Sequence, residues 1–350
     1  MVLPADGPLR GALQDAGVEV LLRPRLAVLR RSLLAPAGMA RLGAATARDA
    51  RELSSLIRRR RVALVHSNTS VVLAGAAAAA LARVPHVWHV REIYARFGRA
   101  WPAYRRLLDS ADALPCVSRA AAAQFTDRRR GPGRSPRATV IYDGLALACE
   151  PAPRAAARAA LGLAPDVPAI ALLGRISDWK GQDVLVRALA QPPLAARGAV
   201  AVLAGDPWPG AEERLERVLA LADSLGVAGR LRLLGFREDV ENVYGACELI
   251  AVPSTEPDPL PGAAIESAAA GCAVIASACG GLPEIIRDGR TGRLVAPGDE
   301  RELAAVAASL LDDERERARL GAAARLDVRE RFDAQRMIAA VAALYGRLLR

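Results

Sequence analysis

The chain has 350 residues and a mass of 36.8 kDa, which exceeds one ordinary domain and suits two. Hydrophobic residues make up 52% of it and charged residues 25%, a balance typical of a folded chain with a packed core. The net charge of +10 is unevenly divided, because residues 1–150 carry +13 and residues 151–350 carry −3. Nucleic acid, an anionic membrane surface and a phosphorylated substrate could each explain the basic half.

The sequence argues against several protein classes. No apolar run reaches the ~20 residues that a membrane-spanning helix needs, and the N-terminus lacks the pattern of a secretory signal. The five cysteines are scattered without a CxxC pair, so neither a disulfide framework nor a zinc site is expected. We therefore expect a protein of the reducing cytoplasm.

Apolar runs of strand length alternate with longer helical stretches along the whole chain, a pattern that predicts parallel sheets with crossover helices. The expected strands are Val18–Leu22, Val62–His66, His86–Val90, Leu114–Val117, Thr139–Tyr142, Ala169–Leu173, Ala199–Ala204, Leu231–Leu234, Leu249–Val252 and Val274–Ala276. Pro151 and Pro153 punctuate the chain between two such series. The pattern predicts an α/β protein with two Rossmann-like domains, 1–150 and 151–330, followed by a C-terminal helix at 331–350 that packs back toward the first domain.

Arginines are densest at Arg58–Arg61 and Arg128–Arg130. Each run is either a solvated surface or a surface that meets anionic lipid head groups. Nucleic acid is the less favoured partner, because no aromatic side chains interleave with these arginines to stack on bases.

The segment from Gly174 to Gly181 follows the apolar run Ala169–Leu173 directly. A glycine at a strand end lets a ligand approach the backbone, and the next helix offers free N–H groups to an anion. Arg175 and Lys180 add two cations, an arrangement suited to a diphosphate. Lys180 is also the single lysine among 48 basic residues. The segment matches neither a Walker loop nor GxGxxG, and an ordinary surface turn is the alternative.

Two carboxylates, Asp258 and Glu266, bracket the start of a predicted helix at Pro261. Glu266 is placed to accept both hydroxyls of a ribose, while the amides of Gly262 and Ala263 face phosphate. The alternative is an acidic loop whose charges only complement the helix dipole.

The order and spacing of these motifs resemble those of the retaining nucleotide-sugar glycosyltransferases of family 4, which have the GT-B fold. The second half carries the resemblance through G-R-x4-K-G at Gly174–Gly181, Leu203–Asp206, Leu233–Phe236 with Asp239, the carboxylate pair, Gly280–Glu284 and Asp288–Gly292. The first half matches more diffusely at Val65–Asn68, His89–Glu92, Val117–Arg119 and Val140–Gly144.

The resemblance implies a donor nucleotide-sugar in the C-terminal domain, an acceptor in the N-terminal one, and catalysis between them. Arg175 and Lys180 would neutralise the donor diphosphate, Glu266 would hold the ribose, and the backbone at Gly235 and Phe236 would frame the base. The implied donor-binding residues are Gly174, Arg175, Lys180, Gly235, Phe236, Leu260, Gly262, Ala263 and Glu266.

The catalytic residues implied by the same resemblance are Arg175, Lys180, Asp258 near the reacting carbon of the sugar, and His89 opposite it. His89, Arg91 and Glu92 would form the acceptor side, although His89 could equally be a structural residue. No cofactor and no metal are expected. The partners would be a UDP-, GDP- or ADP-sugar, a glycan or lipid-linked acceptor, and an anionic membrane surface.

Three departures from the family pattern qualify this interpretation. The first carboxylate of the pair is the shorter Asp258 rather than glutamate, and Leu260-Pro261 replaces the usual Phe-Gly. Met1–Gly7 resembles the end of a second strand, which implies that about one β-α unit of the family pattern is missing before it, and we expect the true start to lie upstream. An inactive remnant that binds sugar nucleotide without turnover is the alternative function.

Overall fold

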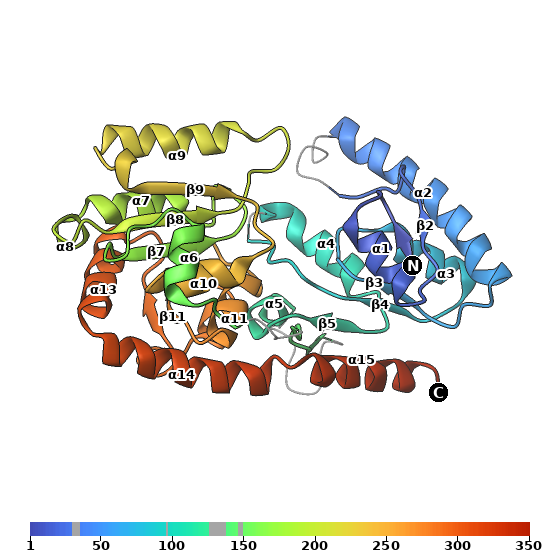
Figure 1. Ribbon diagram of the computed structural model, residues 1–350. Helices are drawn as coiled ribbons and strands as arrows, with labels where there is room; N and C mark the ends of the chain where they lie inside the picture. Colours follow the sequence, from blue (N-terminus) through green and yellow to red (C-terminus); the bar gives the residue numbers. More distant parts are fainter. Residues whose placement is uncertain (30–35, 96, 126–137, 146–149) are drawn as a thin grey trace. The chain divides into compact units, whose positions relative to one another are not determined.

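A computed structural model describes residues 1–29, 36–95, 97–125, 138–145 and 150–350 (Figure 1). The chain forms two compact units. Unit 1 comprises Met1–Cys116, Ala122–Val140 and Val341–Arg350, and unit 2 comprises Val117–Ala121 and Ile141–Ala340. The functional division into 1–150, 151–330 and 331–350 stays a prediction. The arginine run at 128–130, interpreted as a solvated or lipid-facing surface, lies outside the described residues.

Unit 1 alternates short parallel strands with helices. Its strands are β1 (Val2–Leu3), β2 (Leu21–Leu22), β3 (Val65–Ser67), β4 (His86–Trp88), β5 (Leu114–Cys116) and β6 (Ala138–Val140). Its helices are α1 (Pro8–Asp15), α2 (Pro36–Arg59), α3 (Ala74–Ala82), the 3₁₀ turn η2 (Gly98–Ala100) and α4 (Trp101–Leu108), and α5 (Arg119–Ala123) is shared with unit 2. β1 pairs with β2, β3 with β4, and β5 with β6, all in parallel register.

The core of unit 1 forms around β4. Two parallel bridges, Val87 to Ala113 and Val90 to Cys116, join β4 to β5, so β3, β4, β5 and β6 follow one another. The side chain of Trp88 is fully buried, and α2 packs on the alanine-rich α3. Small side chains on α3 allow this close approach of two helices.

The arginine run at 58–61 spans the C-terminal end of α2, whose last residue is Arg59. Arg58 donates to the carbonyl oxygen of Leu81 at 2.9 Å, and Arg60 pairs with Glu19 at 2.9 Å. Part of this charge is therefore already matched within unit 1.

Unit 2 carries a longer alternation of strands and helices. Its strands are β7 (Ala169–Leu173), β8 (Val200–Ala204), β9 (Leu231–Gly235), β10 (Leu249–Val252), β11 (Ala273–Ser277) and β12 (Arg293–Val295). Its helices are α6 (Arg154–Ala160), α7 (Gln182–Ala190), α8 (Pro192–Ala195), α9 (Glu213–Ser224), the 3₁₀ turn η3 (Ala228–Arg230), α10 (Val240–Ala246), α11 (Gly262–Ala269), α12 (Leu282–Ile285), α13 (Glu300–Asp312) and α14 (Glu314–Arg331). The last helix, α15 (Ala334–Leu348), belongs to unit 2 up to Ala340 and to unit 1 from Val341.

The six strands of unit 2 form one parallel sheet in the order β12-β11-β10-β7-β8-β9 (Figure 1). Within this sheet, the first strand of unit 2, β7, is central, and β8 and β9 follow it toward one edge. The chain then returns to the other side of β7 at β10 and continues through β11 and β12 to the opposite edge. β7 and β10 therefore flank the point where the strand order reverses. In doubly wound sheets, ligands bind at this point, beyond the carboxyl ends of the strands.

Both faces of this sheet are covered. Ala169, Ala171 and Leu173 of β7 point into one apolar cluster, shared with α10, α11 and α14. Ile170 and Leu172 point into the other, shared with α7, α9 and α13. Alternation with period two thus fills two cores from one continuous apolar strand.

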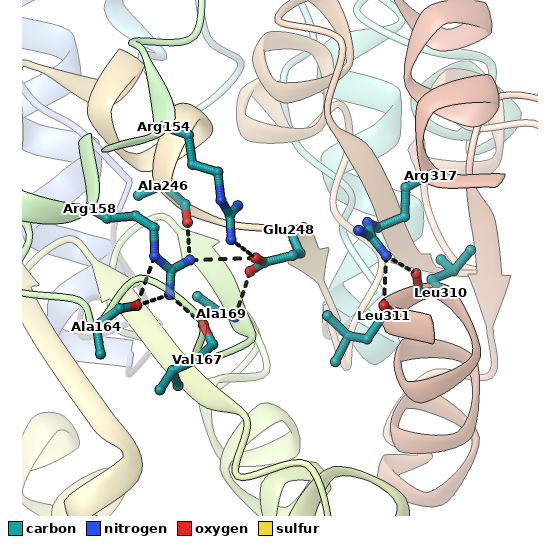
Figure 2. A network of polar contacts seen from close by, with 10 residues as sticks. All are labelled: Arg154, Arg158, Ala164, Val167, Ala169, Ala246, Glu248, Leu310, Leu311 and Arg317. Atoms are coloured by element: carbon teal, nitrogen blue, oxygen red, sulfur yellow. Dashed lines mark hydrogen bonds and ion pairs between the residues drawn. The ribbon is translucent and has the colours of Figure 1, made fainter. Parts of the chain in front are cut away.

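A buried ionic network fixes the amino ends of the central strands (Figure 2). Arg158 of α6 donates to the carbonyl oxygens of Ala246 at 2.8 Å and Ala164 at 2.9 Å. Its side chain is 3% exposed and lies 3.5 Å from the carboxylate of Glu248. The other Glu248 oxygen accepts the Ala169 amide at 2.7 Å, at the start of β7. The network therefore links α6 to the amino ends of β7 and β10. Ligands bind beyond the carboxyl ends of these strands, so the network lies at the opposite edge of the sheet.

The described helices include none that is both long enough and apolar enough to cross a bilayer.

Candidate active site

The predicted phosphate turn lies at the carboxyl end of β7. Gly174 has φ +145°, and Gly181, the residue before α7, has φ +78°. A Cβ at Gly181 would stand 2.0 Å from the carbonyl oxygen of Pro253, just after β10. Glycine is required there because the turn crosses the end of the neighbouring strand in direct backbone contact. The turn thereby brings its cations to the reversal point of the sheet.

Lys180 and Asp258 meet at this point. The Lys180 ammonium donates to Oδ2 of Asp258 at 2.7 Å, and the two side chains are 21% and 11% exposed. Sequence reasoning assigned both residues to the site but did not pair them. The pair joins the end of β7 to the loop after β10.

Two glycines hold Asp258 in place. The Gly281 amide donates to the Asp258 carbonyl oxygen at 2.8 Å. A Cβ at Gly280 would stand 2.2 Å from that same oxygen, and one at Gly281 would stand 2.1 Å from the Pro259 carbonyl. The Gly280-Gly281 motif therefore lets the Asp258 loop lie directly on the turn after β11, and Leu260 packs against the core beside it.

Glu266 lies on α11, one turn after Gly262. A Cβ at Gly262 would stand 3.2 Å from Oε1 of Glu266, so the carboxylate folds back over the first turn of the helix, which begins with Gly262 and Ala263. Burial raises the pKa of the Glu266 carboxyl, and a hydrogen bond with Tyr244 opposes this shift. A half-buried acceptor at a helix start is suited to bind hydroxyl groups.

Arg175 stacks on an aromatic ring that sequence reasoning missed. Its guanidinium carbon lies 3.1 Å from the ring centroid of Trp208, in the loop after β8. Trp208 is 55% exposed. No spacing rule links residues in loops after different strands, although adjacent parallel strands bring their carboxyl ends together. The signal available in the sequence was a tryptophan, Trp208, soon after the expected strand Ala199–Ala204.

Gly235 and Phe236 lie at the end of β9. Gly235 has φ +64° and its carbonyl oxygen accepts the Gly205 amide at 2.7 Å. The Phe236 amide donates to the carboxylate of Asp206 at 3.1 Å, while its side chain is 72% exposed. Part of the backbone expected to frame the base is thus engaged within the protein, and the exposed Phe236 ring is the group that remains accessible.

The predicted acceptor-side residues lie in unit 1. His89 is 3% exposed, and its ring lies 5.4 Å from that of His66 between centroids. Burial, with Arg91 and His66 nearby, lowers the pKa of His89 to about 3. The imidazole is therefore neutral at physiological pH and can act as a hydrogen-bonding group rather than as a cation.

Glu92 and Arg91 are held by neighbouring polar groups of unit 1. The Glu92 carboxylate accepts the hydroxyls of Thr69 and Ser70, and the Arg91 amide at 3.1 Å. Arg91 donates through Nε to Asn68 at 3.2 Å. Glu92 thus anchors the turn after β3.

A third carboxylate in unit 2 joins three of the motifs. Glu284 of the Gly280–Glu284 motif accepts the amides of Arg119 at 2.9 Å and Ala120 at 2.8 Å. It also accepts the Tyr142 hydroxyl at 2.8 Å. The motifs at 117–119, 140–144 and 280–284 therefore converge on one side chain, a connection that their separate positions in the sequence did not reveal.

Within the described residues there is no group of three or more His, Cys, Asp and Glu side chains that could hold a metal ion. The expectation that no metal or cofactor takes part stays a prediction.

Two family models match the chain. The model for Glycosyltransferase Family 4 matches residues 9–148. The model described as "Glycosyl transferases group 1" matches residues 153–327, half of the chain, and includes every motif of the site between Gly174 and Gly292. The chain belongs to the glycosyl transferases group 1 family. This confirms the family resemblance inferred from the motifs.

Curated relatives support the assignment over part of their length. The chain is 40% identical over 178 residues to a D-inositol 3-phosphate glycosyltransferase of Mycobacterium sp. (strain KMS), a match covering 50% of this chain and 39% of the relative. It is 35% identical over 213 residues to the enzyme of that name from Mycolicibacterium smegmatis, covering 60% and 48%. The matches thus span less than half the length of these relatives.

Solved structures agree over nearly the whole chain. The structure of Anabaena HepE in complex with UDP and glucose is 26% identical, with a TM-score of 0.82 and coverage of 99% of this chain and 90% of that one. Sucrose-phosphate synthase from Thermosynechococcus elongatus, at 23% identity and a TM-score of 0.76, covers 99% and 94% and bears on the fold alone. These neighbours confirm the predicted α/β fold of the GT-B type.

Proposed function

We propose that the protein is a retaining glycosyltransferase that moves a sugar from a nucleotide-diphosphate sugar to an acceptor. The observation that carries the proposal is the meeting of Lys180 and Asp258 at the reversal point of a parallel sheet, with Glu266 and Arg175 on neighbouring elements. Family membership supports the same activity.

The donor's diphosphate would lie between Arg175 and Lys180. Breaking the bond between the sugar and the phosphate leaves negative charge on the departing nucleoside diphosphate, and two fixed cations stabilise that charge. The Lys180 ammonium has three N–H donors. It can keep Asp258 as a partner and still donate to phosphate.

Glu266 would accept the ribose hydroxyls, and Asp258 would lie near the reacting carbon of the sugar. His89, neutral because of its lowered pKa, would position the sugar or the acceptor through hydrogen bonds. We take UDP-sugars as the first donors to test, because HepE at 26% identity binds UDP and UDP-glucose. The two protein cations provide the charge stabilisation that other enzymes obtain from a metal, so we propose that turnover needs none.

The decisive experiment measures nucleotide release from UDP-, GDP- and ADP-sugars by the purified chain, with and without candidate acceptors. Release that depends on Lys180 supports the proposal. Binding of a sugar nucleotide without any release would favour the inactive remnant. For an active pair, proton NMR of the first product identifies its anomer, and inversion relative to the donor would contradict the retaining assignment.

We also propose that the acceptor is a glycan or a lipid-linked glycan and that the protein works at the cytoplasmic face of the cell membrane. The net charge of +13 on residues 1–150 supports attraction to anionic lipid, at about 1 kcal/mol per basic residue near the surface. Co-sedimentation with vesicles tests this. Binding to phosphatidylglycerol vesicles that salt abolishes is expected, and equal binding to phosphatidylcholine vesicles would contradict it.

A further inference from the structure

Arg175 carries a full positive charge without an ion-pair partner in the described part of the chain. Its guanidinium lies instead over the indole of Trp208, 3.1 Å from the ring centroid. Trp208 is 55% exposed, which is unusual for so large an apolar side chain. The stack is therefore a surface feature at the candidate donor site, and packing of the core does not require it.

The backbone holds the two loops of this stack together. The Gly174 amide donates to the Ala204 carbonyl at 2.9 Å, and the Ile176 amide donates to the Asp206 carbonyl at 3.1 Å. A parallel bridge continues this pairing from Ile176 to Pro207. Pairing between β7 and β8 thus extends past the strands, and it delivers Trp208 to the position opposite Arg175.

A close approach of two glycines permits the extension. Gly205 has φ +141°, and a Cβ there would stand 2.2 Å from the Gly174 carbonyl oxygen. Any other residue at 205 would force the loops apart. The segment from Gly205 to Pro207 is therefore held against Gly174–Ile176 by backbone contacts, and Trp208 follows it directly.

We propose that Trp208 is a positioning residue for Arg175, which holds the guanidinium flat so that its N–H edge is presented to the donor diphosphate. This rests on the proposed function of the site. A guanidinium that stacks through its face keeps all its in-plane donors for a bidentate bond to phosphate. The stack therefore does not compete with the ligand.

Without the indole, Arg175 is a long, exposed side chain with many rotamers. Binding of a ligand must then order this side chain, which costs conformational entropy. In the wild-type protein the stack has already ordered it before the ligand binds. Trp208 should consequently strengthen diphosphate binding through Arg175 alone, without touching the ligand.

One test needs no ligand. Acrylamide quenching measures how accessible the Trp208 indole is in the free protein. Arg175→Ala should increase the quenching of tryptophan emission, because the guanidinium no longer covers one face of the ring. In a Trp208→Phe background the same substitution should change nothing, since Trp88 is buried and the Arg175 guanidinium lies over Trp208 rather than over Trp101 or Trp179. Unchanged quenching in the wild-type background would overturn the inference.

The second test is a double-mutant cycle, with binding of UDP and of inorganic pyrophosphate measured by calorimetry. Trp208→Ala should weaken both by about three- to fivefold, the range expected for an exposed cation–π contact, and Trp208→Phe should weaken them less. In an Arg175→Ala background, Trp208→Ala should have no further effect. Phe236→Ala is the control, because Phe236 follows the neighbouring strand β9 and is not part of the stack. Its effect on binding should be the same with Arg175 present and with Arg175→Ala.

The outcomes separate this inference from the proposed function. An equal loss from Trp208→Ala in both backgrounds would mean that the indole contacts the nucleotide itself, and no loss in either would mean that it has no part in binding. Each result overturns the positioning role alone. Wild-type protein that binds neither UDP, GDP, ADP nor pyrophosphate would overturn the donor site, and the positioning role with it.

Discussion

The ammonium of Lys180 lies 2.7 Å from Oδ2 of Asp258, although 78 residues separate the two in the chain. Each residue follows a strand that flanks the reversal point of the sheet, β7 before Lys180 and β10 before Asp258. The carboxylate fixes the direction of the ammonium and partly compensates its charge before any substrate is present. An arginine would not duplicate this arrangement, because its planar fork needs more room than a compact ammonium.

Lys180→Ala should lower turnover by about 10²- to 10³-fold, the effect typical of removing one preorganised group from the charge that develops in a transition state. Nucleotide release under saturating donor measures it. Lys180→Arg is the matched control, since it keeps the charge but not the compact shape, and should retain intermediate activity. Similar melting temperatures for both variants would show that folding is preserved, and near-wild-type turnover of Lys180→Ala would remove the lysine from the mechanism.

Sequence patterns predicted the framework of this site well. The bounds of β7 and β10 agree with the expected strands, because each is a continuous apolar run that ends at a glycine or a proline. Glycines at 174, 181 and 280 also marked turns where the backbone does approach a neighbour or adopt positive φ. Local sequence is sufficient where one strand and its following turn decide the geometry.

Contacts between loops were not predictable in the same way. The stack of Trp208 on Arg175 and the convergence on Glu284 depend on which strands become neighbours. The expected strand Thr139–Tyr142 also shifted to Ala138–Val140, and the hydroxyl of Tyr142 bonds to Glu284 beyond the strand end. In unit 1, β2 is limited to Leu21–Leu22 because its partner β1 has only two residues.

Nucleotide binding should depend on pH through Glu266, whose pKa is raised by burial. A carboxylate accepts two ribose hydroxyls, whereas the protonated acid does so less well, so affinity should rise as pH increases through that raised pKa. Glu266→Gln should remove this dependence and weaken binding at neutral pH. Calorimetric titration with UDP between pH 5 and pH 8 measures both effects, with Asp239→Asn as a control on another loop.

The same shift affects the stability of the free protein in the opposite sense. Since the folded pKa of Glu266 lies above the unfolded value, the folded state binds the proton more tightly between the two. The contribution of this group to stability is complete below the unfolded pKa and is lost as pH rises through the folded one. A Glu266→Gln variant whose urea midpoint kept the wild-type slope over this range would contradict the assignment.

Three histidines whose pKa values are lowered by full or partial burial should make unit 1 sensitive to acid. Burial lowers the pKa of His66 and His86 to about 4 and that of His89 to about 3, each from 6.5. Below pH 6.5 these histidines become protonated in the unfolded chain but stay neutral in the folded one. The free energy of unfolding therefore falls as pH decreases from 6.5 toward 4. The loss can reach about 1.4 kcal/mol per histidine for each pH unit.

Urea unfolding at pH 7, 6 and 5, monitored by circular dichroism, measures this loss. His89→Gln should reduce the slope with pH, because the amide has a similar shape but does not titrate. A surface substitution such as Arg99→Gln should leave the slope unchanged. A folded protein equally stable at pH 7 and pH 5 would show that these imidazoles are protonated without cost.

Removal of divalent metal should leave turnover unchanged, because Arg175 and Lys180 provide the positive charge at the proposed diphosphate site. Nucleotide release is measured before and after dialysis against EDTA, and again after addition of Mg²⁺ or Mn²⁺. A fall of more than tenfold that metal restores would contradict metal-independent catalysis. Stimulation of less than twofold is expected, from metal bound to the free nucleotide.

The Arg158–Glu248 network offers a test of stability that spares the donor site (Figure 2). Arg158→Ala leaves Glu248 buried without its inner partner and leaves three carbonyl groups without a donor. We expect a loss of about 3–5 kcal/mol in the free energy of unfolding. Arg154→Ala, which removes the more exposed partner of the same carboxylate, should cost less than about 1 kcal/mol. The network lies at the amino ends of β7 and β10, away from the donor site. Neither variant should therefore change the affinity for UDP at a temperature where the variant is folded. A change in affinity of more than threefold would show that the two ends of the sheet are coupled.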